Sequence, residues 1–462
     1  MHQTAHEPNS FALLREQVQS AFLTAQPDHL ERLHWDARRI ADEQALGLRS
    51  LVAHAVECSP FHRRRLSGVD VPHLGLEGLA ELPVMTKADM MDELDDVFTD
   101  RAITPAAVER ALAATGNEPV PIVGKYFALA SGGSSGHRGV FVVDRDATVA
   151  FFGALSRTLV ARLNALGGPP PGGLPIAQVA AASAVHATGS AEAWTAGGVM
   201  PLRFHSVPVT LPIPEICARL EALQAPMLFG YPSMLARLAR EQRAGRLKIA
   251  PIAVTTSSET LFPDQRDAIA EAFRAPIVDA FGSTEGLVGT SAPDDDVLVF
   301  NTDSCIVELV DEHDEPVPDG VASAKVLLTN LTNRVQPLIR YEITDSFTRR
   351  PPATDHGHLR ATVHGRADDV LRFGAVDVHP LVIRSALLGY REIIDYQVHQ
   401  TTGGIAVDAV APPSFDTAAP RRHLVDALAE AGLRSADVRV RRVTRLAAHP
   451  ETGKCRRFVP LG

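Results

Sequence analysis

The chain has 462 residues, of which 45% are hydrophobic and 22% are charged, and its formal net charge at pH 7 is -10. This composition provides a large core, and it excludes both a single small binding module and a chain that is disordered over most of its length. The acidic balance argues against a general nucleic-acid binder, because neutralising phosphates requires a basic surface.

The cysteines, the first 30 residues and the lengths of the apolar runs indicate where in the cell the protein is located. The four cysteines, at positions 58, 217, 305 and 455, form no CxxC pair and suit neither a disulfide framework nor a zinc site. The first 30 residues lack the pattern of an export signal. No apolar run reaches the roughly 18–20 residues that a membrane helix needs. We therefore expect a cytoplasmic protein with no membrane-spanning segment.

The hydrophobic pattern predicts surface helices near the N-terminus and an α/β region after residue 150. Apolar residues recur at helical spacing over 11–23 and 37–56. A Gly/Ser cluster at 131–136 then separates an apolar stretch from the β-rich segment 140–143, which is typical of a loop between strands. Helix-like and strand-like segments alternate at 151–166, 176–182, 213–223, 227–229, 232–242, 252–256, 263–273 and 277–281. Such alternation predicts a largely parallel sheet.

The pattern changes after residue 300. Short strands at 304–310 and 324–331 flank an acidic turn at 311–320, which predicts a β-rich subdomain. Beyond residue 366, helices at 380–388 and 421–431 alternate with strands at 394–400, 405–411 and 438–443. We expect mixed or parallel sheets in a large domain over 1–366 and a small α+β domain over 367–462.

Two small-residue motifs are candidates for nucleotide binding. The first is the loop Ser131-Gly132-Gly133-Ser134-Ser135-Gly136, whose backbone amides could form an anion-binding concavity, although by itself the motif favours a flexible hairpin linker. The second is Phe281-Gly282-Ser283-Thr284-Glu285-Gly286, which follows the predicted strand 277–281. A carboxylate at the end of a strand is placed to hold Mg²⁺ on substrate phosphates, whereas the alternative is a capped helix start.

Later motifs supply an acid and a cation. Asp345 could accept hydrogen bonds from two ribose hydroxyls, or it could be an ordinary turn residue. Only five of the 45 basic residues are lysines, yet Lys454 lies beside two arginines. This suggests a need for a compact ammonium that reaches into a site, although a lysine in a tail would look the same.

Taken in order, these motifs and Gly365-Arg366-Ala367-Asp368-Asp369 resemble the adenylate-forming superfamily of acyl-CoA synthetases and carrier-protein adenylation domains. Four further stretches are similar to its phenylacetate-CoA ligase branch. They are Ser59-Pro60-Phe61-His62-Arg63, Leu82-Pro83-Val84-Met85-Thr86-Lys87-Ala88-Asp89, Gly230-Tyr231-Pro232-Ser233 and Pro337-Leu338-Ile339-Arg340-Tyr341. The resemblance extends from about residue 50 to the C-terminus.

The resemblance implies roles for individual residues. It identifies 131–136 as an ATP phosphate loop, Ser283 and Thr284 as neighbours of the adenylate phosphate and Glu285 as the Mg²⁺ ligand. Asp345 and Arg366 would contact the ribose, Asp368 would be the hinge of the small domain, and Lys454 would bridge the acyl and phosphoryl oxygens. Ser257, Ser258 and Glu259 would lie near the adenine and the acyl pocket, with Ser258 and Glu259 on the nucleotide side.

Two departures from the family pattern concern the phosphate loop and the acyl pocket. Arg138-Gly139 stands where many relatives place Pro-Lys or Pro-Thr, so Arg138 either supplies the basic phosphate contact or that contact is lost. His186 is kept in its segment without the family's neighbouring Asn and aromatic residue. His356, His358 and His364 have strand-like spacing, but no cysteine or carboxylate completes a metal site.

The hypothesis is an enzyme that uses ATP and Mg²⁺ to convert a small carboxylic acid into its acyl adenylate. The acyl group would pass to CoA or to the phosphopantetheine thiol of an acyl carrier protein. A pocket formed by His186, Phe229, Tyr231, Ser257, Phe281 and Gly282 favours an aromatic acid. Alternatives are a nitrite-activating diazotase of an aryl amine and a non-catalytic nucleotide-binding protein. We expect a monomer or homodimer.

Overall fold

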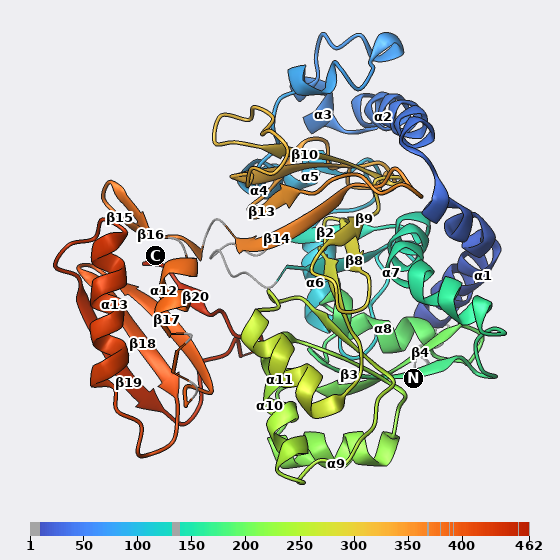
Figure 1. Ribbon diagram of the computed structural model, residues 1–462. Helices are drawn as coiled ribbons and strands as arrows, with labels where there is room; N and C mark the ends of the chain where they lie inside the picture. The colour runs from blue at the N-terminus through green and yellow to red at the C-terminus, as the bar shows by residue number, and fades with distance from the viewer. Residues whose placement is uncertain are drawn as a thin grey trace, which may run out of the picture.

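The computed structural model describes residues 10–131, 139–366, 369–378, 380–387, 389–390, 392–450 and 452–461. These residues form a larger lobe and a smaller C-terminal lobe that lie side by side in Figure 1. Several residues singled out by the sequence lie outside the described residues, namely Gly132, Gly133, Ser134, Ser135, Gly136, Arg138 and Asp368.

Helices make up most of the N-terminal part of the larger lobe and cover its central sheet. They are α1 (Ser10–Glu31), α2 (Ala37–Cys58), α3 (Pro60–Arg65), α4 (Lys87–Asp92), α5 (Leu94–Val97), α6 (Pro105–Ala114), α7 (Arg145–Ala165), α8 (Ala187–Thr195), α9 (Ile213–Leu223), α10 (Pro232–Arg243) and α11 (Pro263–Phe273), with short 3₁₀ turns at Arg32–His34, Val71–His73 and Leu79–Glu81. The two helices predicted nearest the N-terminus are confirmed as α1 and α2.

Local signals in the sequence account for where α2 begins. The Asp36 side chain accepts a hydrogen bond from the backbone N–H of Arg39 and so caps the helix. Leu48, Leu51 and Val52 then recur at helical spacing and are fully buried. The cap fixes the start of α2, and its apolar face fixes the side that packs on the lobe.

The larger lobe has 14 described strands. They are β1 (Phe127–Ala130), β2 (Val140–Val143), β3 (Leu174–Ala180), β4 (Leu202–Pro208), β5 (Met227–Gly230), β6 (Ala253–Ser257), β7 (Ile277–Gly282), β8 (Val288–Ser291), β9 (Leu298–Phe300), β10 (Cys305–Val310), β11 (Lys325–Asn330), β12 (Tyr341–Ile343), β13 (Asp345–Arg349) and β14 (Arg360–Arg366). The β-rich subdomain predicted after residue 300 is confirmed, because β10, β11 and β12 form an antiparallel sheet.

The central sheet has nine strands in the order β13-β14-β9-β8-β7-β6-β5-β3-β4. Strands β7, β6, β5, β3 and β4 pair in parallel, as the alternating pattern predicted, whereas the pairs from β7 to β13 are antiparallel. Alternate residues of β5 face opposite layers. Leu228 packs in the cluster with α9, α10 and α11, whereas Met227 packs on the side of Leu159 and Leu163 in α7. The sheet is therefore buried between two helical layers.

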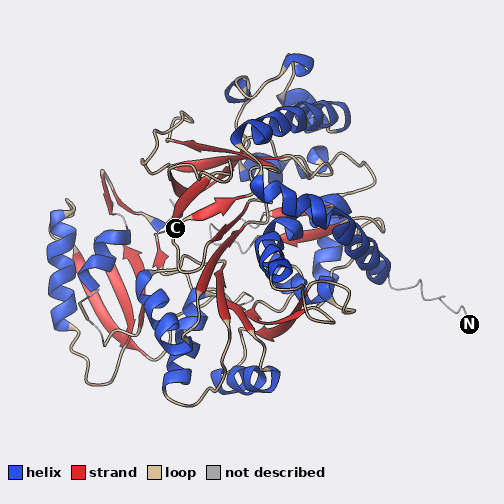
Figure 2. Cartoon of the chain, turned by 45° about the vertical axis from the view of Figure 1, so that its right-hand side comes forward, coloured by secondary structure: helices blue, strands red, loops and turns tan. Residues whose placement is uncertain are grey.

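The C-terminal lobe has a separate core. Its elements are β15 (Leu371–Phe373), β16 (Val376–Val378), α12 (Pro380–Leu387), β17 (Asp395–Thr401), β18 (Gly404–Val410), α13 (Ala418–Glu430), β19 (Asp437–Val443) and β20 (Phe458–Val459). Strands β19-β18-β17-β20 form one sheet, and helices lie against it in Figure 2. Ile383, Val398, Val407 and Leu424 are among the fully buried residues of this core. The helices and strands predicted beyond residue 366 are confirmed.

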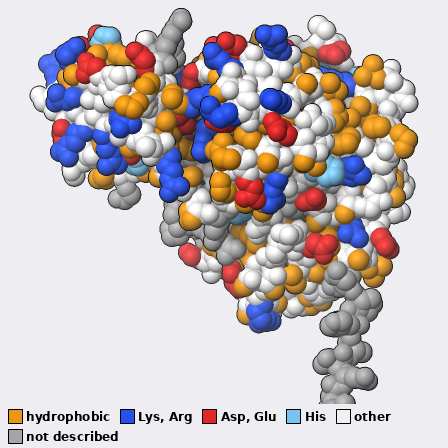
Figure 3. Space-filling view, turned by 90° about the horizontal axis from the view of Figure 1, so that it is seen from below, with side chains coloured by type: hydrophobic (Ala, Val, Ile, Leu, Met, Phe, Trp, Pro, Cys, Tyr) orange, Lys and Arg blue, Asp and Glu red, His pale blue; other side chains and the backbone are white. Residues whose placement is uncertain are grey.

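Within the described part of the chain, no helix combines the length and the apolar character that crossing a bilayer requires. In the view from below, Lys and Arg side chains are prominent on the smaller lobe, at the left of Figure 3. All four cysteines are free, with Cys217 and Cys305 buried.

Candidate active site

A cavity of about 1340 Å³ lies between the two lobes. Its walls come from the ends of β1, β6 and β7 and from the loops before β13, α11 and β20. Many residues predicted from sequence line this one cavity, namely Ser131, His186, Ser258, Glu259, Phe281, Gly282, Ser283, Thr284, Glu285, Asp345 and Lys454. The fold therefore brings together positions that are more than 300 residues apart in sequence.

The segment 283–286 is a tight turn between the antiparallel strands β7 and β8, so the alternative of a capped helix start is wrong. The Ser283 N–H donates to the Leu287 carbonyl (3.0 Å), and the Gly286 N–H donates to the Ser283 carbonyl (3.1 Å). Because β8 returns antiparallel to β7, the chain reverses before a helix can form. Thr284 and Glu285 project from this turn, with 3.4 Å between Thr284 Oγ1 and Glu285 Oε2.

Two asparagine side chains donate hydrogen bonds to backbone carbonyls of this turn. Asn330 Nδ2 donates to the Glu285 carbonyl (2.8 Å), and Asn301 Nδ2 donates to the Gly286 carbonyl (3.3 Å). Gly286 has a φ of +104°, and a Cβ at this position would lie 2.2 Å from Asn330 Nδ2. Glycine is therefore required both by the backbone conformation and by the close approach of Asn330. Sequence reasoning missed both asparagines, because they come from distant strands and carry no motif.

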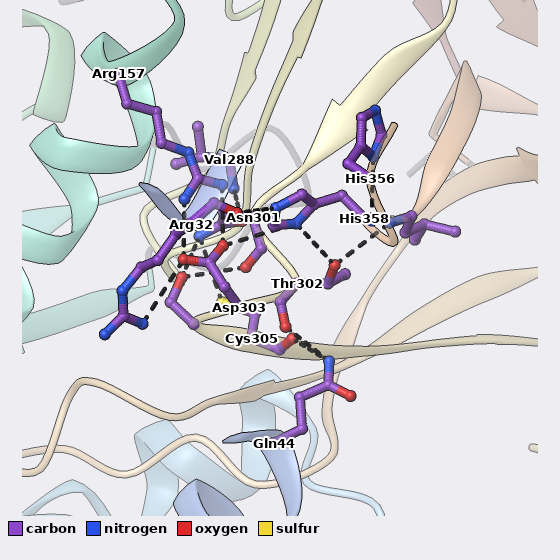
Figure 4. A network of polar contacts seen from close by, with 12 residues as sticks. Arg32, Gln44, Arg157, Val288, Asn301, Thr302, Asp303, Cys305, His356 and His358 are labelled. Carbon is purple, nitrogen blue, oxygen red and sulfur yellow. Dashed lines mark hydrogen bonds and ion pairs between the residues drawn. The ribbon is translucent and has the colours of Figure 1, made fainter. Parts of the chain in front are cut away.

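Figure 4 shows a buried polar network next to Asn301, centred on Asp303. Arg157 donates to both carboxylate oxygens of Asp303 at 2.9 Å, and the two side chains are 5% and 3% exposed. Burial acts to raise the pKa of Asp303, but the Arg157 guanidinium outweighs it and the pKa lies below its ordinary value. This pair joins α7 to the loop at 301–305, which supports the turn at 283–286.

The histidines at 356 and 358 take part in this network. His358 Nε2 lies 2.7 Å from the Arg32 carbonyl, and its Nδ1 lies 3.3 Å from Thr302 Oγ1. Burial and the Arg157 charge lower the pKa of His358. Among the described residues, no group of three or more His, Cys, Asp or Glu side chains is arranged to hold a metal ion. The position of His358 is therefore explained by packing between the 3₁₀ turn Arg32–His34 and the loop at 301–305.

The residues predicted to contact ribose are neighbours in the sheet. Asp345 begins β13 and pairs directly with Arg366, the last residue of β14. Asp345 lines the cavity as the first residue of a strand, so it is not the ordinary turn residue that was the alternative. The Arg366 side chain lies outside the described atoms, whereas its backbone lies beside that of Asp345.

Ser131 and His186 occupy one end of the cavity. The Ser131 N–H donates to the Gly139 carbonyl and its Oγ accepts from the Gly139 N–H, both at 2.9 Å, so the two residues close the base of the Gly/Ser loop. His186 precedes α8, and its Nδ1 lies 3.2 Å from the Ala130 carbonyl, to which only a protonated ring nitrogen can donate. Both residues are thus anchored at the end of β1.

Three residues predicted for the acyl pocket do not line this cavity. Phe229 packs against Phe204, with ring centroids 6.2 Å apart, because its position on β5 faces the layer of α7. Tyr231 is fully buried, and its hydroxyl accepts from the Ala181 N–H at 3.0 Å. Ser257 is also buried, at the end of β6. Neighbouring residues of a strand point to opposite faces of the sheet, and the motifs alone did not predict which face each of these side chains occupies.

Glu259 connects the two lobes. One of its carboxylate oxygens accepts from the Ser233 N–H (3.1 Å) and the other accepts from the Cys455 N–H (2.9 Å) in the C-terminal lobe. The preceding Ser258 has a φ of +69° and also lines the cavity. Burial raises the pKa of Glu259, against the hydrogen bonds from Ser233 and Cys455, which favour the charged form.

Lys454 reaches the cavity from a compact loop of the C-terminal lobe. The Gly453 N–H donates to the His449 carbonyl (2.8 Å), and the His449 N–H donates to the Lys454 carbonyl (2.9 Å). Lys454 Nζ lies 5.6 Å from the centroid of the Tyr231 ring, within the range of a cation–π contact. Tyr231 therefore contacts the predicted catalytic lysine, although it lies outside the cavity lining.

One further lining residue was missed by sequence reasoning. Asp279 on β7 accepts a hydrogen bond from Thr256 Oγ1 (2.6 Å) and lines the cavity. Burial raises the pKa of Asp279. The signal that could have identified it is its spacing, because Asp279 and Phe281 are two residues apart and so share one face of the strand that ends at the turn with Thr284 and Glu285.

Comparison with known proteins adds an independent observation. No family model matches the chain. The sequence is 27% identical over 393 residues to a phenylacetate-coenzyme A ligase of Thermus thermophilus, a match that covers 81% of this chain and 80% of the relative. Together with the motif order, this match makes the chain similar to phenylacetate-CoA ligases of the adenylate-forming superfamily.

Solved structures agree with this adenylate-forming fold. A 2-hydroxyisobutyryl-CoA ligase in its postadenylation state, in complex with R3-HIB-AMP, superposes with a TM-score of 0.68 at 17% identity, covering 92% of this chain and 89% of that one. An anthranilate CoA ligase in complex with anthranoyl-AMP gives a TM-score of 0.50 at 16% identity over 71% of this chain and 64% of that one. The α/β fold class predicted from sequence is confirmed.

Proposed function

We propose that this adenylate-forming protein is an AMP-forming acid–thiol ligase. It activates a small carboxylic acid with ATP and passes the acyl group to a thiol, either CoA or the phosphopantetheine of an acyl carrier protein. The observation that carries this proposal is the single cavity that receives Thr284 and Glu285 from one lobe and Lys454 from the other. A carboxylate on one side of the cavity and an ammonium on the other suit a reaction in which negative charge builds on phosphoryl oxygens.

In the first half-reaction, a carboxylate oxygen of the acid attacks the α-phosphorus of ATP. The new O–P bond forms as the bond to pyrophosphate breaks, which gives the acyl adenylate and free pyrophosphate. Negative charge builds on the phosphoryl oxygens as the reaction proceeds. The Lys454 ammonium, held beside the Tyr231 ring at 5.6 Å, supplies a fixed positive charge for those oxygens.

The residues of the turn fit a magnesium ion. Mg²⁺ prefers oxygen ligands and is commonly held by one or two carboxylates together with substrate phosphates. Glu285 offers a carboxylate to the cavity beside the Thr284 hydroxyl, and its backbone is fixed by Asn330. When bound there, the ion would neutralise phosphate charge. Glu285 would hold it, and Thr284 and Ser283 would lie beside the adenylate phosphate.

The remaining predicted residues divide between nucleotide and acid. We assign Asp345 and Arg366 to the ribose because they pair across β13 and β14, and residues 131–136 to the phosphates because Ser131 lines the cavity. Ser258 and Asp279 are assigned to the adenine side. His186, Phe281 and Gly282 line the end available to the acid. The Phe281 ring in this part of the lining favours an aryl acid. Two of the similar proteins are named for the aryl acids phenylacetate and anthranilate.

The second half-reaction transfers the acyl group to a thiol. The thiol sulfur attacks the acyl carbon, and AMP leaves. The proposal includes a division of the chain into a large domain, 1–366, and a lid, 367–462, that rotates about Asp368 and withdraws Lys454 between the two steps. A cytoplasmic location and a monomeric or homodimeric assembly belong to the same proposal.

The test is an ATP-consumption screen that detects AMP and pyrophosphate separately. The panel contains phenylacetate, benzoate, anthranilate and 2-hydroxyisobutyrate, each with and without CoA, and nitrite with an aryl amine. Pyrophosphate release that depends on one acid, followed by AMP release on adding CoA, is the expected result. Release with nitrite would favour the diazotase alternative. No release with any acid, with or without a phosphopantetheinylated carrier protein, would contradict the proposal.

A further inference from the structure

The loop that carries Lys454 packs directly against the larger lobe. Gly453 has a φ of +66°, and a Cβ there would lie 2.4 Å from Val209 Cγ1, so the loop touches the end of β4 directly. Thr452 is 1% exposed. The lobes thus meet closely at this loop, and a polar group that fixes the contact can decide where the lysine stands.

Glu259 is placed to do this from both sides of the lysine. Its Oε2 accepts from the Ser233 N–H, two residues after Tyr231, whose ring lies under Lys454 Nζ. Its Oε1 accepts from the Cys455 N–H, in the residue directly after Lys454. One carboxylate therefore joins the segment beneath the ammonium to the segment that carries it.

Other polar links between the lobes are made by arginine side chains, such as Arg240, which donates to the Ile394 carbonyl, and Arg457. Arg457 lies 3.5 Å from Asp264, but it also pairs with Asp395 of its own lobe at 2.8 Å, so most of its interaction survives when the lobes separate. Arg457 and Arg384 each lie 4.5 Å from the Phe262 ring. The bond from Cys455 to Glu259, by contrast, is a backbone donor on a single carboxylate oxygen and exists only while the loop is docked.

We infer that Glu259 is a positioning residue for the first half-reaction: it docks the Lys454 loop on the larger lobe and releases it for thiol transfer. This inference deepens the proposed function and rests on it for the role of Lys454. It differs from the sequence prediction, which placed Glu259 at the nucleotide. Burial, which raises the pKa of Glu259, is consistent with a carboxylate that has exchanged water for these two donors.

The first test measures docking without any substrate. Burial raises the pKa of the Cys455 thiol to about 12, so its alkylation by iodoacetamide should be slow while the loop is docked. Glu259→Ala, and the near-isosteric Glu259→Gln, are compared with the control Glu271→Gln, whose side chain is exposed on α11. Labelling is read by mass spectrometry of the peptides. Cys217 and Cys305 are buried, so their labelling would report unfolding.

We expect Cys455 to react about 10-fold faster in Glu259→Ala, because a hydrogen bond to a charged group is lost, and less so in Glu259→Gln. Glu271→Gln should match the wild type, and Cys217 and Cys305 should stay unlabelled in all four proteins. An unchanged Cys455 rate in both folded Glu259 variants would overturn the docking role. This result would leave the ligase proposal intact.

The second test separates the half-reactions. Pyrophosphate release with phenylacetate and ATP should fall about 10-fold in Glu259→Ala, whereas CoA thioester formation from supplied phenylacetyl-adenylate should stay within about twofold of the wild type. Equal losses in both half-reactions would show a general structural role and overturn the inference. A wild-type protein without either activity would contradict the proposed function, while the labelling result would still decide the docking role.

Discussion

The two charged segments that face each other across the cavity are held in different ways. The turn with Thr284 and Glu285 joins two paired strands, receives hydrogen bonds from Asn301 and Asn330, and is backed by the buried Arg157–Asp303 pair. The loop with Lys454 has its own internal bonds, and its polar contacts with the larger lobe include those to Glu259 and the partly exposed Asp264.

Under the proposed function, this difference would distinguish a charge that stays in place from one that moves. Electrostatic catalysis needs groups that are held in place before the reaction begins, and the supported turn fits that need. A reaction with two half-reactions at one site also needs a group that can leave between them, and elements that move are drawn from weakly held regions. The proposal assigns the first requirement to the larger lobe and the second to the C-terminal lobe.

Removing the buried Asp303 carboxylate, which supports the turn, should cause the largest loss of stability. Asp303→Asn leaves the Arg157 guanidinium buried without its counter-charge, which costs about 3–5 kcal/mol of unfolding free energy. Chemical denaturation measures this loss. The control is Asp319→Asn, since Asp319 is 77% exposed in its pair with Arg349 and should change stability little.

The same pair predicts a pH dependence with a definite sign. The folded-state pKa of Asp303 is depressed, so its stabilisation is present above the unfolded pKa and is lost as pH falls through the folded pKa. Unfolding free energy should therefore fall in acid more steeply in the wild type than in Asp303→Asn. Parallel pH profiles would contradict a charged pair that supports the turn.

Removing the charge of Lys454 should slow adenylation and leave the fold intact. Lys454→Ala should slow acid-dependent pyrophosphate release by about 10²–10³-fold, because a preorganised charge is lost from the transition state. ATP binding, measured by calorimetry, and the thermal midpoint should change little. Lys248→Ala, at an exposed position, is the matched control. Wild-type adenylation in Lys454→Ala would refute the assigned role.

Removing one hydrogen bond to the turn at 283–286 should have an intermediate effect on adenylation. Asn330→Ala removes the donor to the Glu285 carbonyl, which is worth about 1 kcal/mol and corresponds to roughly a fivefold loss of adenylation. Because Asn330 acts through Glu285, the Mg²⁺ concentration at half-maximal activity should rise as well. A loss of activity without any change in Mg²⁺ dependence would place the effect elsewhere.

Removing the ion pair between Asp264 and Arg457 should have the smallest effect on adenylation. Asp264→Asn removes an ion pair in which Asp264 is 43% exposed, so a change of about 0.2–1 kcal/mol is expected. Adenylation should fall less than in Glu259→Ala when both are assayed under the same conditions. If Asp264→Asn had the larger effect, Arg457 rather than Cys455 would be the principal contact between the lobes.

Local patterns account for most of the secondary structure and for the motif residues. The helical periodicity of 37–56 predicted α2 because it depends on neighbours in sequence, and the cap at Asp36, seen in the structure, is equally local. The small residues and carboxylate of 281–286 and the position of Lys454 identified both sides of the site for the same reason. The motif alone did not decide between a helix start and a turn at 283–286, because that depends on where β8 pairs.

The sequence by itself determined which chemical groups this protein has and the order in which they occur, since family motifs and side-chain periods are properties of short segments. Only the tertiary structure decided which of them meet. It placed Phe229 and Ser257 outside the cavity, brought Asn330 behind Glu285, and joined Glu259 to the backbone beside Lys454. The physical reason is that these contacts cross between distant strands and lobes, where packing selects the partner and no local pattern records it.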